Sequence, residues 1–367
     1  LYLIIEAKIA GEVRQKTIFR DDIVKMRTVS GDSAPQPRKA EQRRPNRVTA
    51  TEASTDVPRS ADGRELGVFV LPLEGMVGES FRAVEIEKIG EIADEHGPGQ
   101  IIVLLINSNG GLVLESELIT EAIWELKERH RVVAWVEKAI SAGCATAMVC
   151  DEIYFQSHGT AGSVTTISGL SHIPEEQVQP QIDYFVDIAR RSGYSEHIAR
   201  CMKLKKYLCS YDKDEETGEI TWYGDLSGEH VLSNGEQNLT FNASNALACG
   251  FSKGTADTQE DLAELLDLPR WHEISDEGRK MAQEWQDTVK RCKEEVPLLM
   301  QRRDYKNTAA GDPIVRLGTL IQINNKLIRW IDRCPWPCRL MGLPEKDYFE
   351  RENEELRKQI SDLRRRG

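Results

Sequence analysis

The stretch that decides the fold is residues 101–111, IIVLLINSNGG, a run of large apolar residues that ends in polar residues and two glycines. A second strand-like run begins at Gly67, and apolar residues at helical spacing fill 81–95 between the two runs. Strands that lack polar alternation are buried on both faces, as in parallel sheets. The sequence therefore predicts a βαβ unit over 67–106.

The same alternation of strands and helices continues towards the C-terminus. The pattern predicts a helix near 114–129, a strand at 132–136, a small-residue helix at 142–150 and a strand at 152–156. Alternating elements of this kind are typical of an α/β domain with a parallel sheet covered on both faces. We assign this domain to residues 66–270.

Three further regions flank the predicted core. Residues 1–29 predict a small β segment, and residues 30–65, which are rich in Pro, Ser, Thr, Ala and Arg, predict a flexible linker. Residues 271–367 predict a helical C-terminal extension. Its last helix, 346–366, places apolar or Asn side chains at alternating steps of four and three: Phe349, Asn353, Leu356, Ile360 and Leu363. This spacing suits either a helix that packs on its own domain or a short oligomerising coiled coil.

Composition excludes some classes of protein. The 367 residues include 60 acidic and 48 basic side chains, a formal net charge of −12, so we expect no nucleic-acid partner. No window approaches the run of about 18 apolar residues that a membrane helix needs, so the chain as given is expected to be soluble. Because the chain begins at Leu1 rather than Met, the sequence leaves undecided whether a signal or anchor segment precedes it. Membrane association or export is therefore an alternative localisation.

The eight cysteines are scattered along the chain without a dense framework, which predicts free thiols. Cys334 and Cys338 form a close pair, but no second pair or histidine follows at metal-ligand spacing. We therefore expect neither a metal site nor a cofactor.

Two motifs lie where predicted strands end, the place where ligands bind in open α/β sheets. Gly110 and Gly111 offer bare N–H groups to an oxyanion, although two glycines after a strand often form only a turn. Ser141, in the stretch AISAGC at 139–144, begins a helix whose N-terminus favours developing negative charge. A serine at this position is also a common helix N-cap.

Two later stretches, CDEIY at 150–154 and HGTAGSV at 158–164, have no chemistry of their own, yet their order and spacing after the first two motifs are informative. Together the four motifs resemble the Clp protease/crotonase superfamily, and within it the NfeD-type proteases and signal peptide peptidase A. The resemblance covers roughly residues 67–265. It implies a Clp/crotonase-type spiral core of repeated ββα units with a parallel sheet.

The resemblance also implies roles for particular residues. Ser141 matches the nucleophile of the family, and the backbone N–H groups of Gly111 and Ala142 match its oxyanion hole, with Gly110 shaping the turn. Ser108 is a competing hydroxyl. It ranks below Ser141 because it precedes the glycines rather than beginning a helix.

The general base is the part of the pattern that this chain does not match. The NfeD and signal-peptide-peptidase branch uses a lysine, which must be desolvated to become neutral, and the alignment puts Val186 at its position. The core lysines after Ser141 are Lys203, Lys205, Lys206, Lys213 and Lys253. The first three form a polar cluster expected on the surface. Lys138 follows directly on a strand and is expected to point elsewhere.

The Clp branch instead uses a histidine and an aspartate. His172 is the nearest candidate for the histidine, and an ordinary surface-loop histidine is the competing interpretation. Asp183 and Asp225 are the acidic candidates, and the sequence does not rank them.

Three functions follow from these observations. The first is a serine peptidase that hydrolyses peptide bonds through Ser141 and a backbone oxyanion hole. The second is a non-catalytic relative that has lost its base and serves as a binding or assembly module. The third is a crotonase-like acyl-CoA enzyme, for which the sequence offers no carboxylate or pocket signature. The expected partners are a peptide or protein substrate, further copies of the chain and a membrane protein.

Overall fold

The computed structural model describes residues 2–9, 12–19, 66–165, 167–168, 171–172, 175–308 and 310–366. It divides the chain into two compact units, Leu1–Thr55 and Asp56–Gly367. The first unit contains an antiparallel hairpin of β1 (Tyr2–Ile9) and β2 (Glu12–Phe19), within the predicted β segment. The predicted linker, 30–65, lies outside the described residues.

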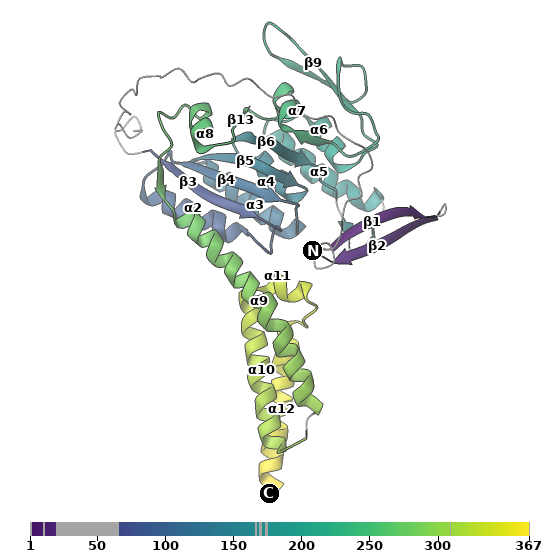
Figure 1. The fold of residues 1–367 in the computed structure, drawn as a ribbon, viewed down its shortest axis with the longest axis vertical. Coiled ribbons are helices and arrows are strands. Elements are labelled where there is room, and N and C mark those ends of the chain that lie inside the picture. The colour runs from purple at the N-terminus through teal and green to yellow at the C-terminus, as the bar shows by residue number, and fades with distance from the viewer. Residues whose placement is uncertain are drawn as a thin grey trace, which may run out of the picture. The chain divides into compact units, whose positions relative to one another are not determined.

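The core of the second unit is a seven-stranded sheet in the order β12-β6-β5-β4-β3-β14, with β13 paired to β6 (Figure 1). Its strands are β3 (Val68–Glu74), β4 (Ile101–Ser108), β5 (Arg131–Ile140), β6 (Glu152–Gly162), β12 (Thr240–Asn242), β13 (Gly254–Thr255) and β14 (Glu273–Ser275). The four long strands are parallel, as the sequence predicts, and so are β13 and β14, whereas β12 runs antiparallel to β6. The sheet is therefore mixed at one edge.

Each long strand buries both faces, and alternate residues belong to different cores. On β3, Phe69 and Leu71 point to the larger core, while Val68 and Val70 point to the smaller one. Period-two alternation between two apolar layers explains the continuous apolar runs at 68–71 and 101–106.

Helices cover both faces of the sheet. The larger core is closed by α2 (Ala83–Glu95), α3 (Val113–Lys127), α4 (Ala142–Val149) and α5 (Glu175–Arg191). The smaller core is closed by α8 (Gln259–Leu265), through its buried Leu262. The expected α/β architecture is thus confirmed.

An additional segment lies between α5 and β12. It begins with α6 (Glu196–Lys203) and continues into a three-stranded antiparallel sheet of β9 (Cys209–Lys213), β10 (Ile220–Tyr223) and β11 (His230–Ser233). A short helix, α7 (Ala243–Ala248), follows β12.

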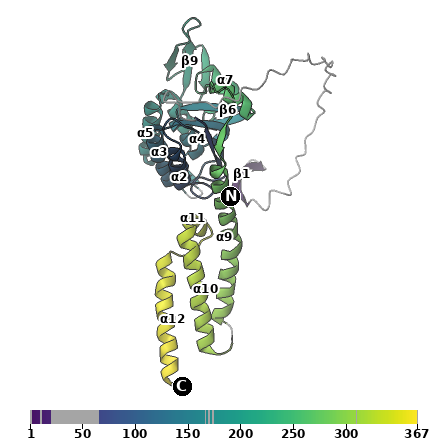
Figure 2. The ribbon, with the colours of Figure 1, turned by 90° about the vertical axis from the view of Figure 1, so that its left-hand side faces the viewer.

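The C-terminal extension is helical in the structure. It consists of α9 (Glu277–Thr308), α10 (Pro313–Arg333), α11 (Pro335–Leu340) and α12 (Lys346–Arg366). The first part of α9 packs on β3 and α2, and its remainder lies beside α10, which in turn lies beside α12 (Figures 1 and 2). The extension and the α/β core therefore belong to one unit.

The seam of α12 packs against its own chain. Phe349 is buried with residues of α9 and α10, and Leu356 is buried with Leu317 and Leu320 of α10. Asn353 accepts a hydrogen bond from Asn324 of α10 at 3.1 Å. In this structure the seam of α12 is therefore packed within the chain, and the oligomerising coiled coil stays a prediction. All eight cysteines are buried and free, which confirms the prediction of free thiols.

Candidate active site

The two glycines after β4 form a turn that is held from one side by the loop following β3. The N–H of Val77 donates to the carbonyl of Gly110 at 3.0 Å, and the carbonyl of Val77 accepts from the N–H of Leu112 at 3.1 Å. A Cβ at Gly111 would lie 2.4 Å from the oxygen of Val77, so no side chain fits there. The close approach of the two backbones therefore requires glycine at this position.

Ser141 has a backbone conformation that serine rarely adopts, with φ 55° and ψ −122°. Its N–H donates to the carbonyl of Gly162 at 3.0 Å, and its carbonyl accepts from the first turn of α4. Ser141 occupies the N-cap position of α4, but its side chain makes no capping hydrogen bond. Such strain at a strand-to-helix junction is typical of a nucleophile held out of the sheet.

The glycine turn and the serine face each other. Gly110 has φ 95°, and a Cβ there would lie 2.5 Å from the Cβ of Ser141 and 3.0 Å from its Oγ. The N–H groups of Gly111 and of Ala142, the first residue of α4, make no hydrogen bond with any described residue. A hydroxyl and two open backbone donors therefore meet at the carboxyl ends of β4 and β5.

Ser108, the competing hydroxyl, has a structural role. It is buried, donates to the carbonyl of Gly75 at 2.7 Å and accepts from the N–H of Gly110 at 3.1 Å. These two bonds tie the glycine turn to the loop after β3. Both the donor and an acceptor site of this hydroxyl are thereby used, which supports its lower rank.

The histidine and aspartate candidates gain no support from their positions. His172 lies in β8 (Ser171–His172), which pairs with β7 (Ile167–Ser168), but its side chain is outside the described residues. Asp183 and Asp225 are exposed and accept hydrogen bonds from near neighbours in their own segments. His172 therefore stays a prediction.

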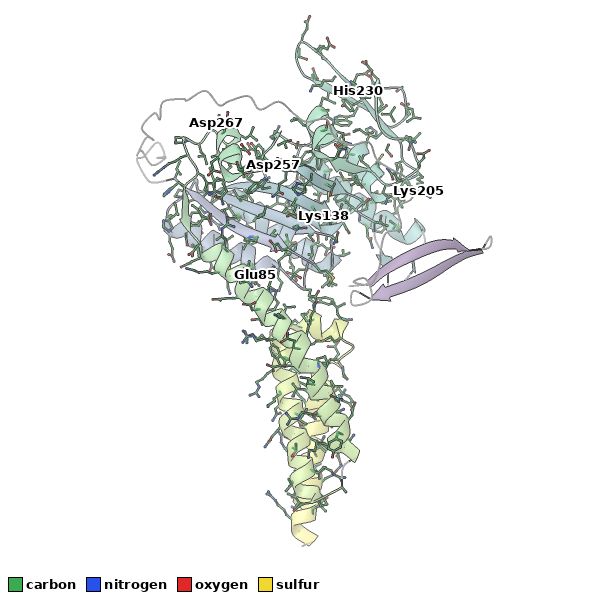
Figure 3. The ribbon with its side chains drawn as sticks, in the orientation of Figure 1. Glu85, Lys138, Lys205, His230, Asp257 and Asp267 are labelled. Atoms are coloured by element: carbon green, nitrogen blue, oxygen red, sulfur yellow. The ribbon has the colours of Figure 1, made fainter. Side chains whose placement is uncertain are left out.

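The structure separates the lysines of the predicted surface cluster. Lys205 and Lys206 are exposed, as expected, whereas Lys203 is only 7% exposed, so the expectation for this residue is wrong. Lys203 follows the fully buried Ala199 by four residues and so lies on the inner face of α6. That spacing is the sequence signal that could have revealed it. Lys138 is exposed on β5 (Figure 3).

The surroundings of Lys203 change its acid–base behaviour. Its Nζ lies 5.5 Å from the centre of the Phe185 ring, on α5, and the next residue is Val186, which is buried in the larger core. Burial disfavours the charged form and lowers the pKa of Lys203 from 10.5 to about 8. A lysine with this pKa is partly neutral near physiological pH and can accept a proton.

The end of α6 that carries Lys203 lies against the elements around Ser141. The carbonyl of Met202 accepts from the N–H of Val164 at 2.8 Å, two residues after the glycine that binds the serine backbone. The Sγ of Cys144, in the first turn of α4, lies 3.8 Å from the Sδ of Met202. Two independent contacts thus connect the residue before Lys203 to the serine junction.

Comparison with known proteins gives one curated relative. No family model matches the sequence. The chain is 28% identical over 217 residues to the membrane protein NfeD1b of Bacillus subtilis (strain 168). This similarity confirms the resemblance to NfeD-type proteins. The matched region is 57% of this chain and 43% of NfeD1b, so it spans less than half of that relative.

Solved structures of membrane proteases are also similar to part of the chain. A 1510-N membrane-bound stomatin-specific protease has 18% identity and a TM-score of 0.43, with 55% of this chain and 84% of that chain covered. The 1510-N membrane protease specific for a stomatin homolog from Pyrococcus horikoshii has 16% identity and a TM-score of 0.38, with 55% and 78% covered. Among the helices that the structure describes, none combines the length and the apolar character needed to cross a bilayer.

Proposed function

We propose that the chain is a serine peptidase in which Ser141 is the nucleophile and Lys203 the general base. The observation that carries this proposal is the strained backbone of Ser141, whose hydroxyl is not used as a cap and faces the glycine turn. Strained residues persist where the surrounding structure holds them, and they cluster at active sites.

The proposed reaction uses the groups described above. Neutral Lys203 takes the proton of the Ser141 hydroxyl while Oγ bonds to the peptide carbonyl carbon, and the carbonyl oxygen becomes an oxyanion. The N–H groups of Gly111 and Ala142 donate to that oxyanion, a contribution of about 10² to 10³ in rate per donor. The C–N bond then breaks, and the amine leaves with the proton from Lys203. Water, deprotonated by the same lysine, attacks the acyl carbon, the bond to Oγ breaks, and Ser141 Oγ takes that proton back from Lys203.

Lys203 replaces the lysine that the family pattern places at Val186. Its Nζ lies 5.5 Å from the ring centre of Phe185, the residue before Val186, so a basic group from α6 reaches the part of α5 where the family base is expected. Hydrogen bonds between a base and its nucleophile commonly tighten only in the substrate complex. The similar NfeD1b is a membrane protein, and the partners we propose are a peptide or protein substrate, a membrane protein and further copies of the chain.

Peptide cleavage by matched lysine variants tests the proposal. Lys203→Met should lower kcat/KM by about 10² to 10⁴, because it removes proton transfer. Lys205→Met, which changes an exposed lysine two residues away, should leave kcat/KM unchanged. Wild-type rates in Lys203→Met would assign the base elsewhere. A wild-type chain that binds peptides without cleaving them would instead support the non-catalytic binding module.

A further inference from the structure

The helical extension contacts the loop 75–82, which connects β3 to α2. Trp285 of α9 is 8% exposed, and its indole N–H donates to the carbonyl of Glu79 at 2.9 Å. Two turns further along α9, Lys293 forms an ion pair with the carboxylate of Glu79, which is itself 7% exposed. The guanidinium of Arg82 lies 3.3 Å above the Trp285 ring. The extension therefore holds this loop by its main chain and by its side chains.

The same loop holds the glycine turn. The N–H of Glu79 donates to the carbonyl of Met76 at 3.1 Å. Val77, which follows Met76, makes the two backbone hydrogen bonds to Gly110 and Leu112. The backbone of Gly111 packs directly against Val77. A short chain of hydrogen bonds thus leads from α9 through Glu79 and Val77 to the glycine turn beside Ser141.

We propose that Trp285 and Lys293 are positioning residues for the oxyanion hole, and that the helical extension thereby controls the reactivity of Ser141. The catalytic part of this inference rests on the proposed function. Oxyanion stabilisation depends on donors fixed at about 2.7 to 3.1 Å from the developing charge, so a small displacement of the turn weakens it. A ligand or partner that shifts α9 would change the reaction rate without touching the substrate.

The inner position of the Glu79 carboxylate explains why Lys293 matters. A carboxylate with so little solvent contact depends on a paired cation, and removing one partner of such a pair costs more than the pair contributes. Without Lys293, a movement of Glu79 towards water lowers the free energy of the loop, because the unpaired carboxylate becomes solvated. That movement displaces Val77, and with it the glycine turn to which Val77 is hydrogen-bonded.

Amide hydrogen exchange tests the structural half of the proposal without any need for activity. The N–H groups of Val77 and Leu112, which make the two bonds between loop and turn, are the reporters. Lys293→Met should raise their exchange rates about tenfold through local opening. Lys293→Arg keeps the ion pair and should exchange like the wild type, as should Lys290→Met, which changes an exposed lysine on the same helix.

Labelling of Ser141 by a fluorophosphonate probe tests the catalytic half on the same variants. Lys293→Met should lower the labelling rate about tenfold, and kcat for peptide cleavage with it, while KM stays constant, because the turn is misplaced rather than lost. Trp285→Phe removes the indole N–H but keeps a ring beneath Arg82. Trp285→Phe should raise the exchange rates and lower the labelling rate, as Lys293→Met does. It is the variant to measure if Lys293→Met does not fold.

The outcomes are distinguishable. Unchanged exchange at Val77 and Leu112 in both variants overturns the proposal, whatever the activity. Faster exchange with an unchanged labelling rate overturns the positioning role and leaves only a stabilising contact. Faster exchange in a chain whose wild type is not labelled supports the link between α9 and the turn and counts against the peptidase assignment.

Discussion

Two polar regions of this molecule differ in how their groups are paired. In the helical extension, Arg303 donates to Asn324 and to Glu352, and the amide of Asn324 donates to Glu352 as well. At the serine junction, Ser141 has a strained backbone, and the two backbone N–H groups beside it have no partner among the described residues. Paired buried groups stabilise a fold, whereas strain next to open donors reduces stability and is typical of functional sites.

The largest expected difference between the regions is in activity. Ser141→Ala should lower peptide cleavage by at least about 10⁴-fold, because it removes the nucleophile, while the melting temperature stays at or above that of the wild type. Peptide kinetics and thermal unfolding measure the two effects. Ser157→Ala, at an exposed serine, is the control, and cleavage retained by Ser141→Ala would assign the chemistry elsewhere.

The glycine turn gives the next largest effect. Gly110→Ala would place a Cβ 2.5 Å from the Cβ of Ser141, and we expect a loss of about a hundredfold in probe labelling. Gly193→Ala is a matched control, because Gly193 also has positive φ but nothing within 4 Å of its Cβ position. Equal effects of the two substitutions would show that backbone strain, rather than the contact with Ser141, is responsible.

The polar cluster of the extension should respond in stability alone. Arg303→Met leaves Asn324 and Glu352 without their cation, and we expect a loss of about 3 kcal/mol in the free energy of unfolding, with activity per folded molecule unchanged. Denaturant unfolding measures this loss. Arg302→Met changes the exposed neighbouring residue and should have no effect. A large drop in activity without a loss of stability would erase the contrast between the two regions.

The smallest effect is a pH dependence that belongs to Lys203. Burial lowers its pKa to about 8, so the neutral fraction, and with it probe labelling, should rise about tenfold between pH 7 and pH 9 and then level off. An unfolded lysine titrates near 10.5, so between the two values the unfolded chain binds more protons, and the free energy of unfolding rises with pH. A pH profile that Lys203→Met leaves unchanged would contradict the assignment.

The sequence predicts the parts of this molecule that depend on local pattern. The apolar strands, the helical extension and the meeting of the glycine turn with Ser141 follow from periodicity and from the order of parallel strands. Lys203 was missed because its neighbours Lys205 and Lys206 are solvated, although the spacing from Ala199 indicates burial. Because the segment 203–206 contains three lysines, its polarity hides the fact that Lys203 belongs to the inner face of α6.

Local sequence pattern does not predict contacts between segments that are far apart in the chain. The bond from Trp285 to Glu79 joins residues 206 positions apart, and the bond from Ser108 to Gly75 depends on two neighbouring strands being in register. The seam of α12 shows the same limit, since its spacing suits a partner in the same chain or in another chain. The packing of α12 on α10 does not follow from that spacing alone.

The central claim is that Ser141 is an activated nucleophile, and its direct test is the site at which a fluorophosphonate reacts. The wild-type chain is incubated with the probe at pH 9, digested, and mapped by mass spectrometry. We predict a single phosphonylated residue, Ser141, and no label at Ser108. A wild-type chain without label at Ser141, under conditions in which a control serine peptidase is fully labelled, would contradict the account.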